Sequence, residues 1–205
     1  MLRAVIFDLD GTLYDNSWLL RLLPLADVRH LLYVSRERNF RVQYRGCSYD
    51  SGEDFYQHLF RAISGSHADK ASRWYHGHFM PLQVHIIRRF CKLDAWVMPR
   101  LAELRSQGVK LAVYSDYGLV SAKLQALGLD PALFDVVTDA PTLGGLKPCE
   151  RSMRRLIDKL GVSANEVMVV GDRKETDIAS AQAVGAQYRL VQRRGKTVTF
   201  TAQID

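Results

Sequence analysis

The sequence predicts an α/β protein in which a doubly wound, mainly parallel sheet carries a helical insertion. Short apolar runs indicate buried strands. Helical patterns that end at glycine alternate with these runs between residues 97 and 191. About 80 residues after the first apolar run show no clear strand pattern. Alternating strands and helices are typical of a parallel sheet that is covered on both faces.

The first expected strand spans residues 3–8, an apolar run that ends before Gly11. A run this short and this apolar fits a strand that is buried on both faces. Four further runs are expected to extend the sheet. They span residues 109–115, 133–138, 167–171 and 187–191. The tail, residues 196–205, alternates polar and apolar residues and indicates an added edge strand.

Four helices are expected between the later strands, and each is followed by a glycine. They span residues 99–107, 119–127, 150–160 and 175–184. Glycine just past the last turn is the usual C-terminal signal of a helix, because it adopts a positive φ at no steric cost.

Residues 15–94 are expected to form a helical domain, with residues 1–14 and 95–205 forming the α/β domain. The helical domain holds 12 Lys and Arg against 8 Asp and Glu, which is +4 of the net charge of +6. It also holds all six histidines. Their spacing shows no metal-binding pattern, so no metal is expected there. Its helical patterns span residues 18–39 with a kink at Pro24, 54–63, 67–79 and 82–91.

The composition, with 47% hydrophobic and 24% charged residues, excludes a disordered chain, a collagen and a coiled-coil rod. The three cysteines show no C-x-x-C spacing and are expected to be free thiols in a reducing compartment. The most apolar stretch, residues 18–34, contains charged residues and a proline, so no membrane span is expected. The N-terminal apolar run is too short for a signal peptide. The predicted location is the cytoplasm.

Polar side chains follow the expected strands at the points where ligands of parallel sheets bind. They are Asp8, Asp10, Ser115, Lys147, Asp172 and Asp177. Asp8 and Asp10 leave the same face of an extended chain, about 6.6 Å apart. With Asp172 they form a hard, all-oxygen ligand set that favours Mg²⁺. Lys147 and Ser115 suit a phosphate group, and Gly11 allows a sharp turn after the strand.

The order and spacing of these residues resemble the four motifs of the haloacid dehalogenase superfamily of phosphohydrolases. The matching segments are Asp8-x-Asp10-Gly11-Thr12, Ser115 after a strand, Lys147-Pro148, and Gly171-Asp172 with Asp177 five residues on. The resemblance implies a Rossmann-like core with a helical cap inserted after the first strand.

The resemblance also implies a role for each residue. Asp8 matches the nucleophile that forms an aspartyl-phosphate, and Asp10 matches the general acid and base, whose backbone carbonyl also binds Mg²⁺. Asp172 matches the third Mg²⁺ ligand. Ser115 and Lys147 match the residues that hold the phosphate. Asp177 matches the acidic group that orients the lysine or binds a water on the metal, while Gly11 and Thr12 support the loop.

Two positions depart from the family pattern. Asp116 follows Ser115 where the family often has Asn, and this adds negative charge beside the phosphate site. Cys149 follows Pro148 where an acidic residue is common, and it is expected to be a packing residue.

The sequence therefore predicts a Mg²⁺-dependent phosphatase of a small phosphorylated substrate. A haloacid dehalogenase, a phosphonate-cleaving enzyme that would use Lys70 or Lys92, and a phosphomutase are alternatives within the family. A non-catalytic nucleic-acid-binding protein is the alternative outside it, suggested by the net charge of +6, although no nucleic-acid motif accompanies that charge. The substrate and the oligomeric state do not follow from the sequence.

Overall fold

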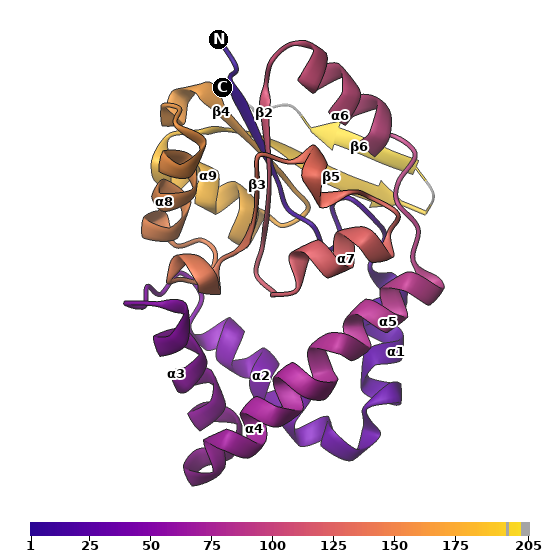
Figure 1. Ribbon diagram of the computed structural model, residues 1–205, viewed down its shortest axis with the longest axis vertical. Helices are drawn as coiled ribbons and strands as arrows, with labels where there is room; N and C mark the ends of the chain where they lie inside the picture. Colours follow the sequence, from indigo (N-terminus) through magenta and orange to yellow (C-terminus); the bar gives the residue numbers. More distant parts are fainter. Residues whose placement is uncertain (196, 202–205) are drawn as a thin grey trace.

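A computed structural model describes residues 1–195 and 197–201 of the chain. Within these residues it shows one six-stranded sheet in the order β3-β2-β1-β4-β5-β6 (Figure 1). All neighbouring strands pair in parallel except β6, which is antiparallel to β5. The strands are β1 (Ala4–Phe7), β2 (Lys110–Ser115), β3 (Val136–Asp139), β4 (Val167–Gly171), β5 (Gln187–Arg194) and β6 (Thr197–Thr201). The expected α/β fold with a mainly parallel sheet is confirmed.

Side chains that alternate along β1 enter two different cores, as a doubly wound sheet requires. Val5 and Phe7 belong to the core on one face, and Ala4 and Ile6 belong to the core on the other. The first face is covered by α6 (Val97–Ser106) and α7 (Val120–Ala126). The second is covered by α8 (Glu150–Leu160) and α9 (Ala179–Val184), which lie together on the left in Figure 1.

Two details of the sheet differ from the sequence prediction. β3 starts at Val136 and not at residue 133, because Pro131–Leu133 form a 3-10 turn. The expected edge strand at residues 196–205 is present as β6 over Thr197–Thr201, while positions 196 and 202–205 lie outside the described residues.

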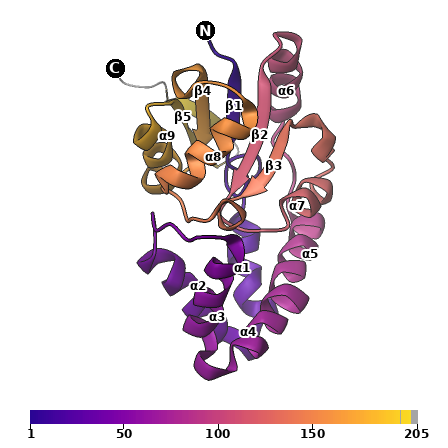
Figure 2. The same cartoon turned by 60° about the vertical axis from the view of Figure 1, so that its left-hand side comes forward.

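The chain between β1 and α6 is helical and lies beyond the carboxyl ends of the parallel strands (Figures 1 and 2). We call residues 17–90 the helical segment. Its α-helices are α1 (Ser17–Ala26), α2 (Leu31–Gln43), α3 (Gly52–Ser64), α4 (Ala68–Trp74) and α5 (Met80–Phe90). Whether it is an independent domain with boundaries after residues 14 and 94 stays a prediction.

One expected helix is divided in the structure, and another contains a π-turn. α1 contains Pro24 and ends at Ala26, and the kink expected at Pro24 stays a prediction. The division comes at Asp27, which leaves the helix and buries its side chain among partners from other turns. The expected helix 67–79 becomes α4 followed by a π-helical turn, Tyr75–Phe79.

The two chain crossings between the sheet and the helical segment are tied together by Arg193 of β5. Its Nε and one Nη donate to the carbonyl oxygens of Gly11 and Thr12, both at 3.1 Å. Its guanidinium also pairs with the carboxylate of Asp94 at 2.5 Å. The backbone N–H of Asp94 donates to the carbonyl of Leu13 at 3.0 Å. Both crossings are thus fixed to the sheet at one point.

None of the helices formed by the described residues combines the length and the apolar content needed to cross a bilayer.

Candidate active site

The loop after β1 places two carboxylates at the edge of a cleft between the sheet and the helical segment. Asp8 directly follows β1, and the chain turns at Gly11 with a φ of +103°. A Cβ at Gly11 would lie 2.4 Å from Oδ2 of Asp172, so a side chain there would collide with that carboxylate. Glycine is therefore required on both steric and conformational grounds.

Asp8, Asp172, Asp177 and Lys147 form one group, which we call the acidic cluster. Nζ of Lys147 lies 2.7 Å from Oδ1 of Asp8 and 2.9 Å from Oδ1 of Asp177. The hydroxyl of Thr12 donates to Oδ2 of Asp8 at 2.9 Å. The backbone N–H of Arg173 donates to Oδ2 of Asp177 at 3.1 Å. The lysine and the three carboxylates thus come from three separate loops.

Burial sets the proton affinities in the acidic cluster. It raises the pKa of Asp8 to about 7, and repulsion from Asp177 adds to that effect. Burial and the charge of Asp8 raise the pKa of Asp172 to about 6, and burial also raises the pKa of Asp177. Burial alone would lower the pKa of Lys147, but attraction by Asp177 and Asp8 raises it well above its usual value. One lysine therefore balances three carboxylates.

The donor set of the acidic cluster fits a hard divalent cation. Asp8, Asp172 and Asp177 each offer one oxygen, and these atoms all lie within 4.8 Å of one another. Oxygen-only ligands favour Mg²⁺ over softer metals, and a cation there would relieve the excess negative charge. The expected ligand set of Asp8, Asp10 and Asp172 stays a prediction; in the structure Asp177 lies with Asp8 and Asp172, and the carboxylate of Asp10 binds other donors. A contribution from the backbone carbonyl of Asp10 stays a prediction.

The carboxylate of Asp10 accepts hydrogen bonds from Tyr14, Ser115 and Lys123. We call these three residues the Lys123 pocket. The hydroxyl of Tyr14 donates at 2.5 Å, Nζ of Lys123 at 2.9 Å, and the hydroxyl of Ser115 at 3.1 Å. Burial alone would raise the pKa of Asp10, but the charge of Lys123 and these hydrogen bonds lower it. In this structure Ser115 therefore binds Asp10.

Lys123 was not among the residues that the sequence predicted for the site. In the structure its side chain is fully buried. It lies in α7, whose other buried residues are Val120 and Leu124. A lysine among the buried positions of an amphipathic helix needs a partner, because an unpaired buried charge is costly. That position in the helical pattern is the signal that could have identified it.

The two departures from the family pattern have clear environments. Oδ1 of Asp116 accepts a hydrogen bond from the backbone N–H of Lys147 at 3.1 Å, and its carbonyl accepts one from Arg41 of α2 at 2.7 Å. Arg41 also pairs with the buried Glu37. The guanidinium of Arg41, from the helical segment, thus lies beside Asp116, the residue that adds negative charge at the phosphate site. Cys149 is buried against Gly145, as expected of a packing residue.

The cleft has a volume of about 270 Å³ and is lined from both sides. The sheet side contributes the acidic cluster, Asp10 and Ser115. The helical segment contributes apolar side chains, among them Leu19 and Phe79, and the exposed Arg38 and Arg45. The volume and the arginines of the chamber suit a small anionic molecule.

Comparison with known proteins assigns the family. The sequence model of the family of haloacid dehalogenase-like hydrolases matches residues 2–185 of this chain. The chain belongs to this family of hydrolases, and the resemblance seen in its motifs is confirmed.

Curated relatives of similar length are named as phosphatases. The glyceraldehyde 3-phosphate phosphatase of Methanocaldococcus jannaschii is 26% identical over 193 residues, which is 90% of this chain and 82% of that protein. The ribulose-1,5-bisphosphate 5-phosphatase of Halopiger xanaduensis is 28% identical over 209 residues, covering 91% of this chain and 83% of that protein.

Solved structures agree in fold. The L-2-haloacid dehalogenase of Xanthobacter autotrophicus superposes with a TM-score of 0.64 at 22% identity, covering 95% of this chain and 79% of the other. CbbY of Rhodobacter sphaeroides, solved in complex with phosphate, gives 0.63 at 18% identity, covering 92% and 85%. At these identities the likeness concerns the fold alone.

Proposed function

We propose that this hydrolase is a Mg²⁺-dependent phosphatase that cleaves a small phosphomonoester through an aspartyl-phosphate on Asp8. The observation that carries the proposal is the pairing of Asp8 with Lys147 at 2.7 Å, beside two further carboxylates at the edge of a small cleft. A carboxylate nucleophile divides a difficult hydrolysis into two easier steps. The phosphatase names of the curated relatives support the same reaction class.

In the first step Asp8 attacks phosphorus, and the bond from phosphorus to the leaving oxygen breaks. Lys147 orients the attacking carboxylate and attracts the phosphoryl oxygens. Mg²⁺ bound by Asp8, Asp172 and Asp177 would favour ionised Asp8 and offset the charge of the phosphoryl group. Asp177 keeps Lys147 in place through its 2.9 Å ion pair.

Asp10 serves as acid in the first step and as base in the second. Its ionised carboxylate in the Lys123 pocket is ready to accept a proton from water, as the hydrolysis of the aspartyl-phosphate requires. To act as an acid it must first take up a proton and turn from Lys123 toward the leaving oxygen. That rotation frees the hydroxyl of Ser115 to donate to a phosphoryl oxygen.

The alternatives have less support. A halide leaves without a proton, so a dehalogenase has no use for the acid that Asp10 supplies, and the dehalogenase structures share only the fold with this chain. A phosphonate-cleaving enzyme would need Lys70 or Lys92, which are exposed and are not among the described residues that line the cleft. A phosphomutase shares the first step and differs in what the phosphoryl group is transferred to.

A panel of phosphorylated sugars, nucleotides and small acids, assayed for phosphate release with Mg²⁺, tests the proposal. We expect turnover of at least one class, loss of turnover in excess chelator, and recovery when Mg²⁺ is added back. A salt titration of RNA binding, run in parallel, tests the nucleic-acid alternative. Full activity in excess chelator, or RNA binding without phosphatase activity, would contradict the proposal.

A further inference from the structure

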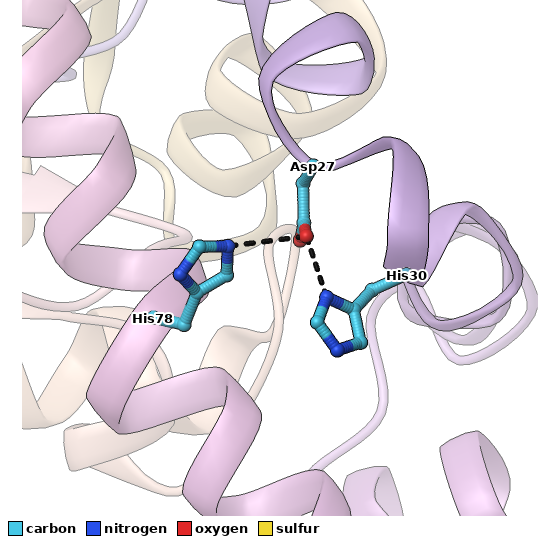
Figure 3. Close-up of side chains that lie close together, drawn as sticks. All are labelled: Asp27, His30 and His78. Atoms are coloured by element: carbon cyan, nitrogen blue, oxygen red, sulfur yellow. Dashed lines mark hydrogen bonds and ion pairs between the residues drawn. The ribbon is translucent and has the colours of Figure 1, made fainter.

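A second group of ligand-type side chains lies in the helical segment, outside the residues that line the cleft. It consists of Asp27, His30 and His78 (Figure 3). We propose that these three residues form a metal site for a borderline divalent transition metal, with Zn²⁺ as the best fit. The site is independent of the proposed phosphatase reaction.

The three ligand atoms converge on one point. Oδ1 of Asp27 lies 2.6 Å from Nδ1 of His30 and 3.1 Å from Nε2 of His78. All three atoms lie within 4.8 Å of one another. Figure 3 shows both imidazole rings pointing at the same carboxylate. Zn²⁺ bonds of about 2.0–2.1 Å place tetrahedral ligand atoms about 3.3 Å apart, so only small shifts would admit the ion.

The carboxylate is fixed in advance by a further hydrogen bond. Nε1 of Trp74 donates to Oδ2 of Asp27 at 2.8 Å, which turns Oδ1 toward the histidines. The side chain of Asp27 is 1% exposed, whereas those of His30 and His78 are 41% and 48% exposed. A buried, oriented carboxylate with two accessible imidazoles is typical of a site whose ligands are held by outer partners and whose open side takes water.

The local backbone brings these residues together against their sequence spacing. Asp27 directly follows α1, and His30 ends the 3-10 turn that comes next. His78 lies 51 positions after Asp27, in the π-helical turn Tyr75–Phe79. A π-turn inside a helix is rare and is often found at functional sites. Sequence spacing therefore gave no sign of the group.

The donor atoms identify the class of metal. Two imidazole nitrogens and one carboxylate oxygen suit Zn²⁺ and its neighbours among the transition metals, while Mg²⁺ prefers oxygen. On binding, each neutral ring carries its proton on the outer nitrogen, Nε2 of His30 and Nδ1 of His78, and offers the inner nitrogen to the metal. The ion then joins the end of α1 to the π-turn and stabilises the helical segment, because it binds only the folded chain.

The test is a calorimetric titration with Zn²⁺ in excess Mg²⁺. The wild-type protein and its Asp8→Asn variant, both depleted of metal, are titrated separately. We expect one Zn²⁺ per chain, retained in Asp8→Asn and lost in His30→Gln and in His78→Gln. Glutamine keeps a donor toward Asp27, so these variants should fold, which circular dichroism checks. His76→Gln, two residues from His78 and also exposed, is the matched control and should bind as wild type.

Two further readouts separate this site from other sources of binding. Co²⁺ should give a visible spectrum without a thiolate charge-transfer band, which excludes the cysteines. Trp74→Phe should weaken Zn²⁺ binding by roughly 10–100-fold, the usual effect of removing an outer partner. No binding by folded wild type, or binding unchanged in both His30→Gln and His78→Gln, would show a hydrogen-bonded group only and overturn the proposal.

Discussion

Asp8 and Asp10 are two residues apart, yet they lie in opposite electrostatic surroundings. In the acidic cluster, burial and repulsion raise the pKa of Asp8 to about 7. In the Lys123 pocket, one lysine and two hydroxyls lower the pKa of Asp10, although its desolvation alone would raise it. Environments that move two nearby carboxylates in opposite directions separate their tasks. Asp8 loses its proton only near neutral pH, whereas Asp10 stays an ionised proton acceptor beside the protein's own lysine.

The largest expected effect on turnover comes from removing the carboxylate of Asp8 from the acidic cluster. We expect Asp8→Asn to reduce turnover by at least about 10⁴-fold, as loss of a covalent nucleophile does. The fold should persist because asparagine has nearly the same shape. Phosphate release and circular dichroism, measured on the same sample, check this. Turnover like that of wild type would remove Asp8 from the nucleophile role.

The next effect concerns the other carboxylate and depends on the leaving group. We expect Asp10→Asn to slow aspartyl-phosphate formation by about 10²–10⁴-fold on an alkyl phosphate, the range of general acid catalysis. The loss should be smaller on p-nitrophenyl phosphate, whose phenolate leaves with less help. Single-turnover measurement isolates this step from the later base step. Equal losses on both substrates would rule out the acid role and reopen the dehalogenase alternative.

Removing the cation of the Lys123 pocket should make Asp10 more like Asp8. Lys123→Met keeps the volume and leaves the donors Tyr14 and Ser115 in place. We expect the pKa of Asp10 to rise, because the charge of Lys123 lowers it in the wild type. The acidic limb of the pH–rate profile should move upward accordingly. Lys159→Met, at an exposed lysine of α8, is the control and should leave the profile unchanged.

The smallest effect is on stability and follows from the raised pKa of the acidic cluster. Folded Asp8 holds its proton up to about pH 7, while the unfolded chain releases it near pH 4, so the unfolding free energy of the metal-free protein falls as pH rises between these values. We expect Asp8→Asn to lack this part of the pH dependence. The Tm of Asp8→Asn minus the Tm of wild type should therefore increase from pH 5 to pH 8. The increase is about 2–4 °C for each kcal/mol of unfolding free energy that wild type loses.

Scanning calorimetry in chelator measures that difference, and Mg²⁺ should reduce it by favouring the ionised wild-type cluster. A gap in Tm that is the same at both pH values would mean that the proton on Asp8 is not linked to folding.

The centre of the sheet could be predicted from the sequence because β1, β2 and β4 are buried on both faces and are short, apolar runs punctuated by glycine. The site residues at the strand ends followed from the same pattern, since ligands of parallel sheets gather there. The acidic cluster, with Lys147 between Asp8 and Asp177, agrees with that expectation.

Contacts that depend on tertiary packing could not be predicted. Lys123 reaches Asp10 across 113 positions, and Arg41 reaches Asp116 across 75, and no local spacing encodes either pair. The break of the expected helix 18–39 at Asp27 has the same origin. The side chain of Asp27 is satisfied by Trp74 and His78 from a distant helix, which outweighs the local helical preference.

The position of β1 in the middle of the sheet has a consequence for the order in which the protein is made. β1 comes before the other strands of the described sheet along the chain, but its two neighbours are residues 110–115 and 167–171. It therefore stays without a partner while the helical segment, whose contacts are more local, is completed. The carbonyl oxygens of Gly11 and Thr12, in the loop after it, gain their bonds to Arg193 only when β5 has been made. Truncation before Arg193 would thus remove these hydrogen bonds from the loop that carries Asp8 and Asp10.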